Sequence, residues 1–99
     1  MSAEVTCDGE RVGLRLHGPL DADGAQLLQS LVQEFDHVAH IDLADVGTID
    51  SSGLFAIVNA DTRARQCGKR LTLVPPPARA RRIFTWTGLD RRLLFLNPA

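Results

Sequence analysis

Hydrophobic and polar residues alternate near the start of the chain. Hydrophobic residues occupy every second position between Arg11 and His17. This period of two predicts a strand that is buried on one side only. A shorter strand is expected around Val5, and Asp8-Gly9 is typical of the hairpin turn that would join the two strands.

The next hydrophobic positions recur at helical spacing. They are Leu27, Leu28, Leu31, Val32 and Phe35. This spacing predicts an amphipathic helix over residues 23–36 whose apolar side packs on a sheet. Asp23 is followed three residues later by Gln26, which predicts a capping box with Asp23 at the start of the helix.

A second helix is predicted after a short strand, Ala39–Leu43. Its apolar positions are Leu54, Ile57, Val58 and Ala64. Asp50-Ser51-Ser52-Gly53 consists of residues that favour helix starts, and the cap is expected from Asp50 or Ser51. Cys67-Gly68 marks the end, because glycine is common just past a helix.

The sequence that follows the second helix predicts a strand over Arg70–Val74, a helix over Ala78–Thr87 and a short strand over Leu93–Leu96. Phe84 and Trp86 are assigned to the hydrophobic core. The order of elements is β-β-α-β-α-β-α-β. Strands separated by helices mostly pair in parallel, so the expected fold is α/β, a mixed four- to five-stranded sheet with about three helices.

Length and composition fit one domain over residues 1–99, because 99 residues with 44% hydrophobic positions can bury a single core. The longest apolar run, Leu54–Val58, is far shorter than the roughly 20 residues that a membrane-spanning helix needs. The chain also starts without a basic and apolar leader. These features predict a cytoplasmic protein that does not insert into a membrane.

The charges are divided unevenly along the chain. Residues 1–50 hold ten acids and two bases (2 − 10 = −8), and residues 51–99 hold nine bases and two acids (9 − 2 = +7). Such asymmetry can indicate nucleic-acid binding. Because apolar residues recur throughout both halves, the two sets of charges are instead expected to interleave in the fold, and no nucleic-acid partner is predicted.

Catalytic and metal-binding motifs are not found in the sequence. The serines of Ile49–Gly53 lack the preceding glycine of a nucleophile elbow, and the segment ending at Gly68-Lys69 lacks the pattern of a phosphate-binding loop. His17, His37 and His40 have no ligand spacing, and Cys7 and Cys67 are expected to be reduced, packed thiols. We therefore expect no enzyme activity, no cofactor and no metal.

One segment combines groups that exceed the needs of a helix cap. Asp50, Ser51, Ser52 and Gly53 stand where the carboxyl end of a strand meets the start of a helix, a place where ligands gather in α/β sheets. The alternative is a simple helix cap. Spacing alone favours the cap, so the residues leave both interpretations open.

Several segments together resemble the STAS domain family, the bacterial anti-sigma factor antagonists. They are Ile41-Asp42-Leu43-Ala44-Asp45-Val46, Ile49-Asp50-Ser51-Ser52-Gly53-Leu54, His17-Gly18-Pro19-Leu20-Asp21, Gly68-Lys69-Arg70-Leu71-Thr72-Leu73-Val74 and Thr87-Gly88-Leu89-Asp90. The resemblance extends over essentially the whole chain. Departures are Pro19, in place of the usual acidic residue, the three prolines at 75–77, and the lack of a further C-terminal helix.

The resemblance implies partner switching without catalysis by this protein. The unmodified antagonist binds an anti-sigma factor that is also a serine/threonine kinase, and the sigma factor is released for transcription. Phosphorylation ends the complex, and a phosphatase resets it. The motif implies Ser51 as the phosphorylated residue, with Ser52 as the second choice and Asp21, Asp50 and Gly53 flanking the site. Weak nucleotide binding is left open.

The second predicted helix offers a face for the partner. Phe55, Asn59, Thr62 and Arg63 lie about four residues apart, outside the apolar side of the helix. Phe55 is either an exposed anchor for the partner or a residue at the margin of the core, and the sequence favours neither.

A second function is compatible with the same resemblance. Small STAS subunits on the cytoplasmic face of lipid-trafficking ABC transporters are similar in length and in the I-D-L and D-x-x-G-L segments. The pair Ser51-Ser52 favours the regulator, because the transporter subunits often carry threonine or small residues there. The short C-terminus favours the transporter subunit.

Overall fold

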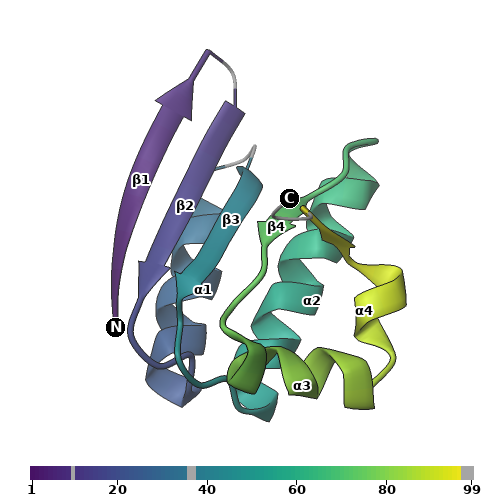
Figure 1. Cartoon of the computed structure of the whole chain (residues 1–99). Helices are drawn as coiled ribbons and strands as arrows, with labels where there is room; N and C mark the ends of the chain where they lie inside the picture. The colour runs from purple at the N-terminus through teal and green to yellow at the C-terminus, as the bar shows by residue number, and fades with distance from the viewer. Residues whose placement is uncertain (10, 36–37, 97–99) are drawn as a thin grey trace.

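The computed structural model describes residues 1–9, 11–35 and 38–96, and Figure 1 shows the arrangement of its elements. In chain order these are β1 (Ser2–Asp8), β2 (Arg11–His17), α1 (Ala22–Glu34), β3 (Val38–Asp45), α2 (Ser51–Gln66), β4 (Thr72–Val74), α3 (Ala78–Trp86), α4 (Leu89–Arg92) and β5 (Leu94–Phe95). Within the described ranges, no helix is both long and apolar enough to cross a membrane.

The strands form one five-stranded sheet in the order β1-β2-β3-β4-β5. β1 pairs with β2 in antiparallel orientation, and the other neighbours are parallel. α1 and α2 lie together behind the sheet in the view of Figure 1. The predicted fold class is confirmed. The structure adds α4, a single turn between α3 and β5.

As its alternating sequence predicts, β2 is buried on one face only. Leu14 and Leu16 are buried against the helices, while Arg15 is exposed on the other face of the sheet. From α1 and α2, Leu28 and Ile57 meet these strands and are fully buried. Burial of such a side chain contributes roughly 1.5 to 3 kcal/mol to the stability of the fold.

The start of α1 differs from the prediction. The N-cap is Asp21, whose carboxylate accepts a hydrogen bond from the backbone N–H of Gly24 at 3.0 Å, so the predicted cap at Asp23 is wrong. Asp21 can act as the cap because its own backbone is extended, whereas Asp23 already lies inside the first turn. The helix ends at Glu34, and its predicted last residue, Asp36, lies outside the described residues.

The assignment of Trp86 to the core is also wrong. Phe84 is fully buried and packs edge to face against Phe95, with ring centroids 5.0 Å apart. Trp86 is 78% exposed. Two positions along a helix correspond to a rotation of about 200°, so the residue that follows Phe84 by two points away from the core.

Both cysteines are free, as expected, but neither is packed in the core. Cys7 is exposed on the edge strand β1, and Cys67 is exposed at the C-cap of α2. β1 is an edge strand, and the described residues supply no further strand beside its outer edge. His37, one of the three histidines considered in the sequence, lies outside the described residues.

The charges of the two halves do not interleave. Because the order of the strands in the sheet follows the order of the chain, the acidic strands β1 and β3 lie towards one end and the basic α3 and α4 at the other (Figure 1). The ion pairs found among the described residues each join two residues of the same half. The expectation of mixing is therefore wrong.

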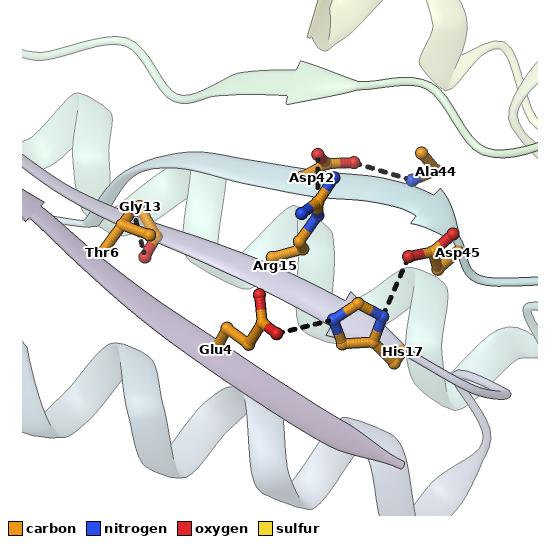
Figure 2. A network of polar contacts seen from close by, with 8 residues as sticks. All are labelled: Glu4, Thr6, Gly13, Arg15, His17, Asp42, Ala44 and Asp45. Atoms are coloured by element: carbon orange, nitrogen blue, oxygen red, sulfur yellow. Dashed lines mark hydrogen bonds and ion pairs between the residues drawn. The ribbon is translucent and has the colours of Figure 1, made fainter.

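Polar side chains connect β1, β2 and β3 on the face of the sheet opposite α1 and α2 (Figure 2). His17 Nδ1 lies 2.9 Å from Asp45 Oδ2, and its Nε2 lies 3.7 Å from Glu4 Oε1, which is too long for a hydrogen bond. Arg15 Nε lies 3.6 Å from Asp42 Oδ2. These contacts tie the antiparallel edge to the parallel part of the sheet.

One buried charge was not expected from the sequence. Asp61 in α2 is 1% exposed, and its Oδ2 lies 3.0 Å from Nε of Arg65, one turn later. Arg65 and Arg70 both donate to the backbone carbonyl of Arg92, at 2.8 and 2.9 Å. The arginines therefore connect the end of α2 to the end of α4.

Candidate functional site

The loops before α1 and α2 are joined at Leu20. Its N–H donates to the Thr48 carbonyl at 2.9 Å, and its carbonyl accepts from the Asp50 N–H at 3.2 Å. This pairing of Leu20 with Ile49 is parallel and lies outside the main sheet. It places the N-termini of α1 and α2 next to each other at the carboxyl ends of β2 and β3.

Both helices begin with the same arrangement. The sequences are Asp-Ala-Asp-Gly at α1 and Asp-Ser-Ser-Gly at α2. Asp50 accepts from the N–H of Gly53 at 3.0 Å, the same geometry that joins Asp21 to Gly24. A Cβ atom at residue 53 would overlap the carbonyl oxygen of Leu20, which explains the need for glycine at this point of close approach.

The structure shows which residue caps α2. Because the Asp50 carboxylate caps the helix, the hydroxyl of Ser51 is not needed as a cap. Ser51 is the first residue of α2, and both it and Ser52 are exposed. Neither hydroxyl makes a hydrogen bond within the described part of the chain, so both are accessible to a modifying enzyme.

A groove of about 560 Å³ lies between α1 and α2 beside the two serines. It is lined by Ala22, Ala25, Gln26 and Gln29 from α1 and by Ser51, Ser52 and Phe55 from α2. Phe55 is 68% exposed, so it does not belong to the margin of the core. The structure thus leaves an aromatic side chain open to solvent one turn after Ser51.

The rest of the predicted partner face is less uniform. Asn59 and Arg63 are exposed, as expected. Thr62 is partly buried, and its hydroxyl donates to the Val58 carbonyl of its own helix at 3.0 Å, so that hydroxyl is already used.

The contribution of α1 to the groove was not predicted from the sequence. Gln26 and Gln29 were included in the helix but not in the site. They stand on the polar side of α1, which faces the groove because Leu28 and Val32 on the other side are buried. The polar face of α1 could be read from the sequence. A polar helix face is, however, equally typical of a surface that only contacts solvent, so it did not indicate a groove.

The described residues form no metal centre. Over the ranges that the structure describes, no three His, Cys, Asp or Glu side chains gather closely enough to hold a metal ion. The site offers two hydroxyls, two capping carboxylates, an aromatic ring and two amides. These groups can bind a protein surface and accept a phosphoryl group.

Comparison with known proteins identifies the family. The family model described as Mlab, STAS domain matches residues 3–96. The chain belongs to the STAS domain family. A search of curated protein sequences finds no match.

Solved structures share the fold. A protein from Thermotoga maritima assigned as an anti-sigma factor antagonist is 25% identical, with 96% of this chain and 86% of that chain covered and a TM-score of 0.84. The anti-sigma factor antagonist SpoIIAA of Bacillus, in its unphosphorylated form, is 19% identical, with 98% and 90% covered and a TM-score of 0.80. An anti-sigma factor antagonist from Mycobacterium paratuberculosis is 21% identical, with 99% and 86% covered and a TM-score of 0.78.

Proposed function

We propose that this protein is an anti-sigma factor antagonist that catalyses no reaction itself. In its unmodified form it binds an anti-sigma factor that is a serine/threonine kinase, and a sigma factor is released for transcription in the cytoplasm. The kinase transfers a phosphoryl group to the hydroxyl of Ser51, and the complex dissociates. A phosphatase returns the protein to its binding form.

The observation that carries this proposal is the exposed hydroxyl of Ser51 beside the groove. The Asp50 carboxylate already caps α2, so the Ser51 hydroxyl is not needed to cap the helix. The likeness to anti-sigma factor antagonists supports the same role, and SpoIIAA has been solved in a phosphorylated form as well as the unphosphorylated one.

The position of Ser51 suits a switch that leaves the fold intact. A phosphoserine carries about −1.5 to −2 charges at neutral pH, and the start of a helix stabilises an anion by roughly 0.3 to 1 kcal/mol. No core side chain has to move, because Ser51 is exposed. Phosphorylation is therefore expected to preserve the free energy of unfolding.

The same charge is unfavourable in an interface. A dianion on Ser51 would stand next to the Asp50 carboxylate. The hydrogen bonds of Leu20 also bring the start of α1, with the Asp21 carboxylate, next to the start of α2. A partner that covers this surface removes water from three negative groups at once. Weakening the complex a thousandfold requires about 4 kcal/mol, which repulsion and lost hydration can supply together.

The experiment uses three forms of the protein as baits in the native host: wild type, Ser51→Ala and Ser51→Asp. We expect the alanine form to retain an ATP-binding anti-sigma partner and the aspartate form to lose it. The purified partner is then given ATP with wild type, Ser51→Ala or Ser52→Ala. Phosphorylation should disappear only in Ser51→Ala.

Ser30→Asp is the matched control, since it adds the same charge to the exposed surface of α1 without a change at Ser51. It should bind as wild type does. Equal binding by Ser51→Asp would exclude the switch, and loss of phosphorylation only in Ser52→Ala would move the site to Ser52.

A transporter subunit remains the second candidate, because the matching family model carries the name Mlab. The same baits distinguish it. A permease or ATPase of a transporter that is held equally by all three forms would make the protein a structural subunit and would reduce Ser51 to the first residue of α2.

A further inference from the structure

A second hollow lies on the other side of the loop that leads to α2. It has a volume of about 260 Å³ and is lined by Gly47, Thr48 and Ile49 of this loop and by Arg79, Arg82 and Trp86 of α3, among others. It shares no lining residue with the groove between α1 and α2. The hollow is therefore a separate surface.

The charge of α3 is entirely positive. The helix contains Arg79, Arg81 and Arg82 and no acidic residue, and all three arginines are exposed. None of them takes part in the ion pairs formed within the described residues. The acidic strands lie at the opposite end of the sheet, so nothing in the order of the elements brings their charges to α3.

Trp86 gives this surface an apolar element. At 78% it has the largest exposed fraction of any large hydrophobic residue in the described ranges. Exposure of an indole ring leaves apolar surface in water, and tryptophan and arginine are among the residues enriched at the energetic centres of protein interfaces. Ile83 adds a partly buried apolar side chain to the same hollow.

We propose that the hollow of Arg79, Arg82 and Trp86 is a docking site for an acidic segment of a protein partner. Carboxylates of the segment pair with the two guanidinium groups, and an aliphatic side chain between them packs on Trp86 and Ile83. Arginine suits this role because its planar guanidinium binds a carboxylate through two parallel hydrogen bonds. The site does not depend on the state of Ser51.

The dimensions and charges favour a protein segment over nucleic acid or a membrane. Charge-driven binding to nucleic acid neutralises several phosphates at once, about six to ten in a strongly salt-dependent complex, whereas two arginines line this hollow. The hollow is concave and has room for single side chains. A membrane surface would contact a broad basic and apolar helix face, whereas α3 has nine residues and buries Ala80 and Phe84.

Trp86 is the single tryptophan of the chain, so its fluorescence reports on this site alone. The probe is a short peptide of glutamate, leucine and alanine, and the comparison peptide has lysine at each glutamate position. The acidic peptide should shift the Trp86 emission to shorter wavelength in a saturable manner at physiological salt. The lysine peptide should cause no shift.

The double variant Arg79→Glu/Arg82→Glu should bind the acidic peptide at least about tenfold more weakly, as expected for the loss of charge-assisted hydrogen bonds. Arg11→Glu/Lys69→Glu is the matched control, because it changes the net charge equally at two exposed positions outside α3. It should bind as wild type does. Ser51→Asp should also leave the peptide affinity unchanged.

Four results would overturn the proposal. The first is no saturable shift with the acidic peptide, and the second is equal weakening in both double variants. The third is a shift with phosphatidylglycerol vesicles or with single-stranded DNA but not with the peptide. The fourth is a dimer in sedimentation that the Arg79→Glu/Arg82→Glu variant dissociates, which would make a second copy of the chain the occupant.

Discussion

Gly53 of α2 lies directly against the backbone of Leu20. A Cβ atom at residue 53 would overlap the Leu20 carbonyl oxygen and would lie 2.6 Å from Leu20 Cγ. Gly53→Ala should therefore lower the free energy of unfolding by about 1 to 3 kcal/mol, the usual cost of overpacking. Denaturant unfolding of the purified variant measures this change.

Gly47→Ala is the control for this substitution. Gly47 stands in the same loop region, but a Cβ atom there would meet nothing within 4 Å. We expect its stability to stay within about 0.5 kcal/mol of wild type. If both variants were equally stable, the close approach of Leu20 to Gly53 would not be a constraint on the fold.

The N-cap of α1 can be tested with two aspartates of the same turn. Asp21→Ala removes the hydrogen bond to the Gly24 N–H and should cost about 1 kcal/mol of stability. Asp23→Ala removes an exposed carboxylate that makes no cap, and at high salt it should cost less than about 0.5 kcal/mol because the helix dipole is screened. Thermal unfolding of both variants compares them, and a larger loss for Asp23→Ala would contradict the observed cap.

The buried ion pair in α2 leads to a third prediction. Arg65→Met keeps most of the aliphatic stem but leaves the Asp61 carboxylate buried without a partner, because its other oxygen has no hydrogen bond. We expect a loss of about 2 kcal/mol, below the 3 to 5 kcal/mol of a fully buried pair because Arg65 is partly exposed.

The double variant Asp61→Leu/Arg65→Met supplies the comparison. It removes the buried charge together with its partner, so denaturant unfolding should show that most of the lost stability returns. Arg63→Met, an exposed arginine of the same helix, should change little. A double variant no more stable than Arg65→Met would mean that the carboxylate is not the source of the loss.

Phe55 is predicted to contribute to binding and not to folding. Because the ring is 68% exposed, Phe55→Ala should leave the unfolding temperature nearly unchanged. It should weaken the complex with the proposed anti-sigma partner by about 2 kcal/mol or more, as is typical of an aromatic anchor. Calorimetric titration measures the affinity. Val5→Ala, at the exposed edge strand β1, is the control that should bind normally.

The regular elements could be predicted because they follow from local patterns. In Arg11–His17 the apolar residues alternate, and after Ser51 they recur at helical spacing. The first pattern places them on one face only in a strand, and the second only in a helix, so each pattern predicts its element. The ends of elements were less accurate. Asp21 and Asp23 are both good caps by residue type, and only the backbone conformation distinguishes them.

The candidate site was predicted in part. The sequence placed Asp50, Ser51 and Ser52 at the start of a helix, where the structure has them. It could not decide which of these residues caps the helix or whether Phe55 is exposed. Both depend on how α2 is seated against α1 and the loop at Leu20, which involves residues about thirty positions away.

By itself, the sequence determined the succession of strands and helices and the motif at the start of α2, because these depend on neighbouring residues and on a single face of each element. The tertiary structure alone decided that Asp61 is buried, that Trp86 is exposed and that the acidic and basic halves lie at opposite ends of the sheet. Each of these depends on which elements become neighbours in space. A chain pattern with a period of two or 3.6 residues carries no information about such long-range packing.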